Sequence, residues 1–320
     1  MGEFELIERY FKRPVRRAAL GVGDDCALLA PQPGMQLAVS SDMLVQGRHF
    51  LPTVAPEHLG YKALAVNLSD LAACGAQPLA YTLALALPEA QAAWLERFAH
   101  GLHALADAHG CELVGGDTTQ GPLTISITVI GQVPTGCALL RSGAKPGDDL
   151  YVSGHLGDAR SALEVFRGTV SVSQQALHTA RQRMEQPTPR VALGQALRGV
   201  ASAAIDISDG LLGDLGHLLH ASGCGATLQA DAACATMLCA AELPLAQRRA
   251  MVLAGGDDYE LAFTAPASAR AAVAAASASA QTPVARIGQI DSAPGLRLIA
   301  SDGQALAAQD YPSFDHFAQG

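Results

Sequence analysis

Hydrophobic and polar positions along the chain follow two periods, which separate expected helices from expected strands. Apolar side chains recur with a helical period of about 3.6 residues through 56–74, and they alternate with polar ones through 123–133, which predicts a strand there. The same patterns predict further helices at 3–11, 89–109, 158–166, 191–199, 210–221 and 268–279. Further strands are expected at 26–30, 36–41, 79–87, 112–114, 150–153, 203–207, 259–264, 284–290 and 296–299.

Helices and strands mix in both halves of the chain, a pattern typical of α+β domains. The chain has 320 residues, more than one domain usually contains, so two domains are expected. The Pro-Gly turn in Lys145-Pro-Gly-Asp-Asp149 precedes a new strand and indicates the boundary. We therefore predict an N-terminal domain over 1–144 and a C-terminal α+β domain over 145–320.

Charge and hydropathy narrow the classes of function. The net charge of -9 argues against a nucleic-acid-binding protein, which normally presents a basic face. The three lysines cannot form a polybasic patch for a membrane surface. The longest apolar stretch, 63–87, is interrupted by Asn67, Asp70 and Pro78, so it does not predict a membrane span.

Cysteine usage and the N-terminal sequence bear on the compartment. The seven cysteines form no C-x-x-C pair, which is typical of reduced thiols. Residues 1–17 lack the apolar run of a signal peptide. Both observations predict a cytoplasmic protein.

Aspartates are unusually frequent and recur in similar short motifs. Of the 30 acidic residues, 19 are Asp, in a chain where only 16% of residues are charged. Carboxylate and hydroxyl oxygens suit hard cations such as Mg²⁺, which also bridge substrate phosphates. The motifs place these acids beside Gly or Ser: Gly23-Asp-Asp25, Ser40-Ser-Asp42, Ser69-Asp70, Gly115-Gly-Asp117, Asp206-Ile-Ser-Asp209 and Gly255-Gly-Asp-Asp258.

Any single motif of this kind is better explained as a helix cap or a turn, because Asp and Ser are common in both. Six of them in a charge-poor chain favour a metal site instead. No D-x-[DN]-x-[DN]-G calcium loop and no G-x-x-x-x-G-K-[ST] phosphate loop occurs. Metal ions, helped by Arg141 and Lys145, would then have to neutralise the charge of a polyphosphate.

Six longer motifs, five of which contain these acids, occur in a specific order and spacing. They are Gly21-Val-Gly-Asp-Asp-Cys-Ala27, Asn67-Leu-Ser-Asp-Leu-Ala-Ala73, Gly115-Gly-Asp-Thr-Thr119, Arg141-Ser-Gly-Ala-Lys-Pro-Gly147, Ile205-Asp-Ile-Ser-Asp-Gly-Leu211 and Gly255-Gly-Asp-Asp-Tyr-Glu-Leu261. Together they resemble the thiamine-monophosphate kinase family, from Gly2-Glu-Phe4 to Phe314-Asp-His-Phe317. The resemblance implies transfer of a phosphoryl group from ATP to thiamine monophosphate. It also implies the aminoimidazole-ribonucleotide synthetase-like fold, with two mixed α/β domains and N-terminal strands paired across a homodimer.

The resemblance further implies roles for individual residues. The N-terminal domain would bind ATP and Mg²⁺ and form the dimer, and the C-terminal domain would complete the nucleotide and substrate site. Several Mg²⁺ ions would be held by Asp25, Ser41, Asp42, Asp70, Asp117, Asp206 and Asp209. ATP would contact Ser40, Gly116, Asp117, Arg141 and Ser208. Thiamine monophosphate would contact His49, Asp257 and Phe314.

Three positions depart from the family's commoner pattern. Ser41 replaces Thr and keeps the hydroxyl, Asp257 replaces Glu and is one methylene shorter, and Phe314 replaces Tyr and loses a hydroxyl. No general base is assigned, because the second pKa of a phosphate monoester is about 6 and its oxygen is already anionic near neutral pH.

Two alternative classes of protein stay open at this point. One is another ATP-using member of the superfamily, such as selenophosphate synthetase or the hydrogenase-maturation carbamoyl dehydratase. Both usually carry a reactive terminal Cys or selenocysteine, whereas here the first cysteine is Cys26 and the last four residues are Phe317-Ala-Gln-Gly320. The other is a metal-dependent nucleotide-binding protein without catalytic activity.

Overall fold

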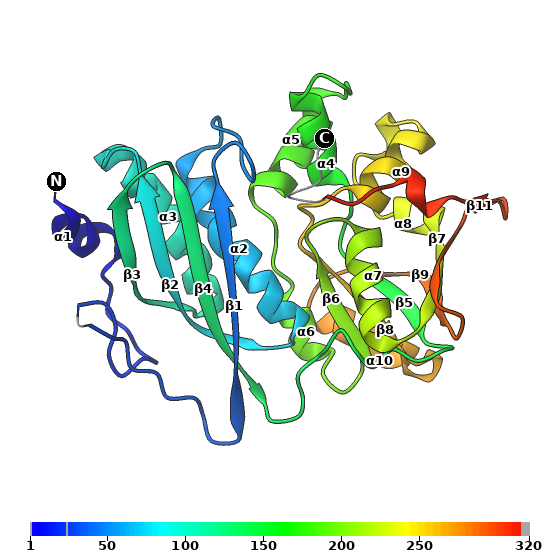
Figure 1. The fold of residues 1–320 in the computed structure, drawn as a ribbon, viewed down its shortest axis with the longest axis horizontal. Helices are drawn as coiled ribbons and strands as arrows, with labels where there is room; N and C mark the ends of the chain where they lie inside the picture. The colour runs from blue at the N-terminus through cyan, green and yellow to red at the C-terminus, as the bar shows by residue number, and fades with distance from the viewer. Residues whose placement is uncertain (1, 24, 315–320) are drawn as a thin grey trace. The chain divides into compact units, whose positions relative to one another are not determined.

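The computed structural model describes residues 2–23 and 25–314, which fold as two compact units. The first unit comprises Met1–Leu71 and Ala76–Gly136, and the second comprises Ala72–Gly75 and Cys137–Gly320. Both units mix helices and strands, which confirms the predicted α+β class (Figure 1). Over the described residues, every helix is too short or too polar to cross a membrane.

The first unit contains a four-stranded sheet with the order β1-β4-β2-β3, in which only β2 and β3 run parallel. Alternate residues of the central strand β4 are buried at Ile125, Ile127 and Val129, and this face of the sheet packs on α2 and α3 (Figure 1). The elements are α1 (Glu3–Leu6), a π-helical turn (Ile7–Phe11), β1 (Met35–Val45), α2 (Pro56–Ala73), β2 (Gln77–Leu87), α3 (Ala92–His109), β3 (Glu112–Gln120) and β4 (Thr124–Pro134).

The second unit contains a seven-stranded sheet with the order β11-β10-β7-β9-β5-β8-β6. Its central strands β5 and β8 are buried along their whole length, and α7 follows directly from β6 at the sheet edge. The strands are β5 (Asp149–Ser153), β6 (Ala203–Ile207), β7 (Gly225–Gln229), β8 (Glu260–Ala265), β9 (Val284–Asp291), β10 (Gly295–Ile299) and β11 (Ala305–Leu306). The α-helices are α4 (Asp158–Phe166), α5 (Gln174–Glu185), α6 (Val191–Ala196), α7 (Leu211–Ser222), α8 (Ala230–Cys234), α9 (Leu245–Ala254) and α10 (Arg270–Ser279).

Two predicted strands differ from the observed ones. The prediction of a strand over 26–30 is wrong, because Leu28 forms only an isolated bridge with Leu20. Pro31 and Pro33 follow it and lack the N–H groups that would extend a ladder. The strand expected to end at Val114 continues through the Gly-Gly pair as far as Gln120.

Candidate active site

Strand β1 and helix α2 bring together four polar residues of the first unit. The Ser40 hydroxyl donates a hydrogen bond of 2.5 Å to Oδ2 of Asp70, and the Asp42 backbone N–H donates to Oδ1 of Asn67 at 3.1 Å. Asn67 is buried, and its own amide group donates to the Ala63 carbonyl at 3.0 Å, which fixes its orientation. Asn67 lies three residues before Asp70, on the same side of the helix.

Asn67 is a functional candidate that the sequence interpretation did not assign. The signal for it was available, since an amide three residues before a proposed metal ligand faces the same strand. Its contact with the backbone of Asp42 means that one helix carries Asp70 and also binds the strand at Asp42.

Ser41 lies on the opposite face of β1, because successive strand residues point to opposite sides. Its hydroxyl donates to the Ile127 carbonyl at 3.1 Å and lies 3.0 Å from the Thr128 hydroxyl. The structure therefore does not bring the Ser41 hydroxyl beside the carboxylate of Asp42.

Gly116 and Asp117 lie on β3, at the other edge of the same sheet. Gly116 has a φ of +150°, and a Cβ there would come within 1.9 Å of the Leu83 carbonyl oxygen, so only glycine fits. Asp117 is exposed and pairs with Ala84. Since β4 and β2 intervene, about 14 Å separates the backbones of β3 and β1 at the usual strand spacing. Within the sheet, Asp117 is thus apart from Asp42.

Asp25 and His49 occupy irregular segments of the first unit. Asp25 lies within the loop closed by the Leu20–Leu28 bridge, while its neighbour Asp24 lies outside the described residues. His49 follows β1, and its Nδ1 accepts the Val45 N–H at 2.9 Å. An accepting Nδ1 carries no proton, so the neutral ring presents its N–H at Nε2.

In the second unit, the turn at Ser208–Gly210 lies between β6 and α7. It carries Ser208, which is assigned to ATP, and Asp209, which is assigned to Mg²⁺. Oδ2 of Asp214 accepts the backbone N–H groups of Ser208, Asp209 and Gly210 at 3.0, 3.0 and 3.2 Å. Asp214 is buried, and this burial raises its pKa to about 6 against the lowering effect of those hydrogen bonds. The sequence interpretation gave Asp214 no role, although an acid in the first turn of a helix is a recognisable signal.

The Gly255–Tyr259 loop packs directly on that turn. The Asp257 N–H donates to the Ser208 carbonyl at 2.7 Å, and a Cβ at Gly256 would come within 2.4 Å of the same oxygen. The Phe314 N–H donates to the Asp209 carbonyl at 3.1 Å. Residues proposed to bind metal and ATP are therefore hydrogen-bonded through their backbones to residues proposed to bind the acceptor.

Backbone strain marks the same loop. Asp257 has a φ of +73° and Tyr259 a φ of +51°, values that cost non-glycine residues of the order of 1 kcal/mol each. Two buried acids, one inside the loop and one directly after it, hold it in place. Both oxygens of Asp258 accept the Gly157 N–H at 3.0 Å, and burial raises the pKa of Asp258 well above its usual value. Glu260, fully buried, accepts bonds of 2.6 Å from two arginine side chains, those of Arg183 and Arg190.

The remaining two assigned residues are also in the second unit. Asp206 is buried on β6 and pairs with Leu261 on β8. Arg141 is exposed before β5, and its carbonyl accepts the Ser222 hydroxyl at 3.0 Å.

The donor set fits Mg²⁺ in its chemistry, because it consists of carboxylate and hydroxyl oxygens. Across residues 2–23 and 25–314, no three His, Cys, Asp or Glu side chains gather closely enough to hold a metal ion. In proteins Mg²⁺ is usually held by one or two carboxylates, with water and substrate phosphates completing its shell.

Comparison with known protein families defines the class of protein. The family "AIR synthase related protein, N-terminal domain" matches residues 23–133, and "AIR synthase related protein, C-terminal domain" matches residues 145–301. The structure of HypE, a hydrogenase maturation protein from E. coli, shares the fold, with a TM-score of 0.76 at 22% identity over 98% of both chains. The fold is thus that of the AIR synthase-related proteins.

Closer relatives identify the family within this class. The thiamine-monophosphate kinase of Salmonella typhimurium (strain LT2) is 48% identical over 99% of this chain and 98% of its own, and that of Escherichia coli K12 is 45% identical over the same shares. The crystal structure of thiamine-monophosphate kinase from Stenotrophomonas maltophilia K279a has a TM-score of 0.84 and 44% identity, covering 95% of this chain and 96% of the other. The chain belongs to the thiamine-monophosphate kinase family and is a kinase.

Proposed function

We propose that this enzyme transfers the γ-phosphoryl group of ATP to thiamine monophosphate. The AaThiL structure complexed with AMPPCP and TMP supports these two substrates, with a TM-score of 0.74 and 28% identity over 90% of this chain and 89% of the other. The products would be thiamine diphosphate and ADP. The reaction would be the last step in forming that cofactor.

One observation carries the proposal. In the second unit, the Ser208–Asp209 turn is hydrogen-bonded to Asp257 and to Phe314. The first pair is assigned to ATP and metal, and the second pair to the acceptor. A phosphoryl donor and its acceptor must be held about 3 Å apart, and backbone contact between their binding residues provides for that.

The proposed chemistry needs positioning and charge neutralisation rather than a general base. An anionic phosphate oxygen of thiamine monophosphate attacks the γ-phosphorus in line, and the bond from that phosphorus to the β–γ bridging oxygen breaks. When bound, several Mg²⁺ ions would offset the repulsion between the two anions. They would be held by Asp25, Ser41, Asp42, Asp70, Asp117, Asp206 and Asp209.

The other assigned residues bind and orient the substrates. ATP contacts are assigned to Ser40, Gly116, Asp117, Arg141 and Ser208. Thiamine monophosphate contacts are assigned to His49, whose Nε2–H suits a phosphate oxygen, to Asp257 and to the ring face of Phe314. In this proposal 1–144 supplies most ATP and Mg²⁺ contacts and the dimer interface, and 145–320 completes the site.

We further propose that the enzyme is a homodimer that pairs through the N-terminal strands. Strand β1 is an edge strand, and Leu37, Val39 and Met43 on it are 47%, 63% and 55% exposed. An unpaired edge with apolar side chains is prone to pair with another chain, and a second copy would cover it.

A purified-protein assay tests the reaction. ADP and thiamine diphosphate should form in equal amounts, only when ATP, thiamine monophosphate and Mg²⁺ are all present, and unphosphorylated thiamine should not replace the monophosphate. ATP binding without ADP formation would instead indicate a nucleotide-binding protein without catalysis. ADP formation at the same rate with and without thiamine monophosphate would indicate an ATPase.

A further inference from the structure

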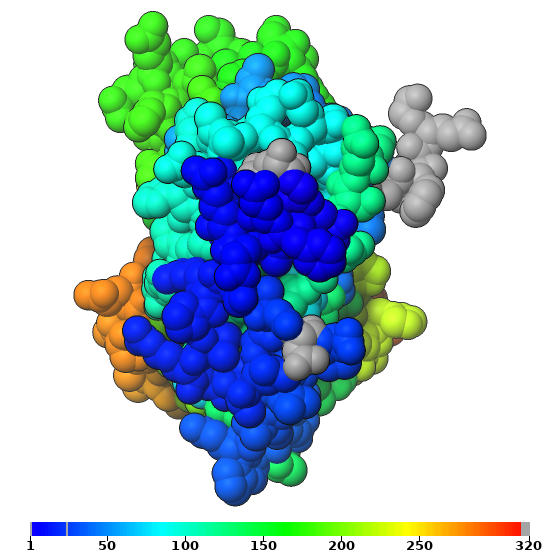
Figure 2. All heavy atoms as spheres, turned by 90° about the vertical axis from the view of Figure 1, so that its left-hand side faces the viewer, coloured from blue at the N-terminus to red at the C-terminus, as the bar shows by residue number. Residues whose placement is uncertain are grey.

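The segment from Lys12 to Leu29, here called the N-terminal arm, lies against the end of α3 and the start of β3. Figure 2 shows the N-terminal part of the chain, in blue, spread across this side of the molecule. The Arg13 guanidinium makes two hydrogen bonds of 3.1 Å with the Asp107 carboxylate of α3. A second guanidinium, that of Arg17, donates to the Pro78 carbonyl at 3.0 Å.

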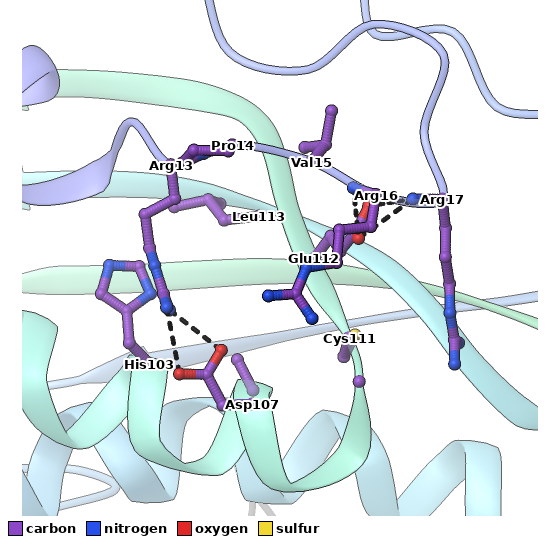
Figure 3. Close-up of a pocket in the computed structure, with 12 residues that line it drawn as sticks. Arg13, Pro14, Val15, Arg16, Arg17, His103, Asp107, Cys111, Glu112 and Leu113 are labelled. Carbon is purple, nitrogen blue, oxygen red and sulfur yellow. Dashed lines mark hydrogen bonds and ion pairs between the residues drawn. The ribbon is translucent and has the colours of Figure 1, made fainter.

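Glu112, the first residue of β3, holds the backbone of the arm. Its Oε1 accepts the N–H groups of Arg16 and Arg17 at 2.7 and 3.0 Å, and its Oε2 accepts that of Arg17 at 3.0 Å (Figure 3). The same Oε2 also accepts the N–H of Ala18 at 3.1 Å. Burial acts to raise the pKa of Glu112, but these bonds outweigh it and lower that pKa. One ionised side chain thus satisfies three consecutive backbone donors.

Where Glu112 binds the arm, its apolar packing comes from Val15, which is partly buried against the cluster that contains Ala18 and Leu79. A cavity of about 440 Å³ lies beneath residues 13–17 and is lined by Val15, His103 and Leu113 among others (Figure 3). Beyond the cavity, Ala18 is buried against Leu79 and Val114. The arm is therefore fixed by the polar contacts of Arg13 and Glu112 together with the packing of Val15.

The fixed stretch leads directly into the loop that carries Asp25. The Ala19 N–H donates to the Leu28 carbonyl at 2.8 Å, and the Leu28 N–H donates to the Leu20 carbonyl at 3.0 Å. Ala27 and Leu29, on the return side, pack against the cluster that contains Ala18. Displacement of residues 16–18 would therefore displace both sides of the loop and Asp25 with them.

We infer that Glu112 is a positioning residue for Asp25, acting through the N-terminal arm and not through contact with substrate. This inference rests on the proposed function, which assigns Asp25 to the Mg²⁺ site. Glu112 belongs to none of the aspartate motifs, and its effect follows only from the contacts described above.

Hydrogen exchange and a double-mutant cycle test the inference. In metal-free protein, Glu112→Ala should speed amide exchange of residues 16–28 by about ten-fold or more, as expected for the loss of charged hydrogen bonds. In the loaded enzyme it should lower kcat/KM by about ten-fold, and it should add less than two-fold in an Asp25→Asn background. Glu112→Gln keeps one acceptor oxygen and should recover part of both effects.

The matched control is Glu57→Ala, which breaks an ion pair of 2.8 Å with Arg97 elsewhere in the first unit. It should leave exchange of the arm and kcat/KM unchanged. Unaltered exchange in Glu112→Ala would overturn this inference and leave the proposed function intact. So would a ten-fold loss of kcat/KM when Glu112→Ala is added to Asp25→Asn. An Asp25→Asn variant with wild-type activity would instead contradict the proposed function.

Discussion

The hydroxyl of Ser40 on β1 donates a 2.5 Å hydrogen bond to the carboxylate of Asp70 on α2. A hydrogen bond to an ionised acceptor is among the stronger ones in proteins, and this one fixes the rotamer of Asp70. Because Asn67 binds the backbone of β1 one helical turn earlier, the helix and the strand are held at two adjacent points. These contacts therefore fix the position of Asp70 relative to β1.

This relationship separates the effects of two substitutions. Asp70→Ala should lower kcat by several orders of magnitude, because it removes a proposed metal ligand, whereas Ser40→Ala should lower kcat/KM by roughly ten-fold, because it loosens that ligand and removes a proposed ATP contact. Steady-state ADP formation and thermal melting of both variants provide the measurement. Near-wild-type turnover in a folded Asp70→Ala variant would rule out its proposed role.

Side-chain periodicity predicted most elements because it reports burial, which the fold then satisfies. Helix α2 and strand β4 begin and end within one or two residues of the predicted limits. Helix α5 was not predicted, since its sequence is mostly polar and its buried face carries small residues such as Ala176 and Ala180. Strand β3 was predicted too short because glycine normally weakens strands, whereas Gly116 is required here by the nearby Leu83 backbone.

The candidate site was predictable in its chemistry but not in its arrangement. Motifs identified the carboxylates and hydroxyls, yet the supporting residues Asn67, Glu112 and Asp214 act on backbone groups of other residues. Such contacts depend on tertiary structure, so spacing along the chain gives only weak signals for them. The same holds for the separation of Asp117 from Asp42, which follows from strand order.

Ion pairs between the buried Asp149 carboxyl and two partly exposed arginines predict how stability depends on pH. The Arg270 guanidinium, hydrogen-bonded to Asp149, lowers the pKa of this buried carboxyl to about 2, with help from Arg286. A pKa lowered by folding means that the unfolded state binds more protons, so the stabilisation is full above about pH 4 and is lost as the pH falls towards 2. Both arginines are more than half exposed, so solvent screens the pairs and the stabilisation at neutral pH is about 1 kcal/mol.

Asp149→Asn should accordingly lower the free energy of unfolding at pH 7, and the difference from wild type should shrink below pH 4. Urea denaturation at a series of pH values measures this difference. A gap between the two proteins that stays constant from pH 7 to pH 3 would show that Asp149 does not contribute through its charge.

Two glycines of the second unit should respond in opposite ways to the same substitution. Gly256→Ala places a Cβ 2.4 Å from the Ser208 carbonyl oxygen, so the loop must move away from the turn. We expect kcat/KM to fall by at least ten-fold, with an increase in KM for thiamine monophosphate. Gly216→Ala, within α7, meets no atom within 4 Å and should raise stability by up to about 1 kcal/mol.

Gly216→Ala is thus the control for the effect of an added methyl group, and its activity should equal that of the wild type. Substrate kinetics and thermal melting distinguish the two variants. Unchanged kinetics in Gly256→Ala would show that contact between the loop and the turn does not control the acceptor site.

The exposed edge of β1 gives a test of the proposed homodimer. Val39 is 63% exposed, so Val39→Lys adds a charge to the edge without removing packing from the unit itself. If two copies pair there, desolvation of paired lysines should weaken association by a hundred-fold or more, since a buried unpaired charge costs several kcal/mol. Sedimentation velocity should then detect monomers at concentrations where the wild type is dimeric. Leu238→Lys, at a 48% exposed position of the second unit, is the matched control and should remain dimeric. If Val39→Lys sediments like the wild type, the dimer must use another surface of the chain.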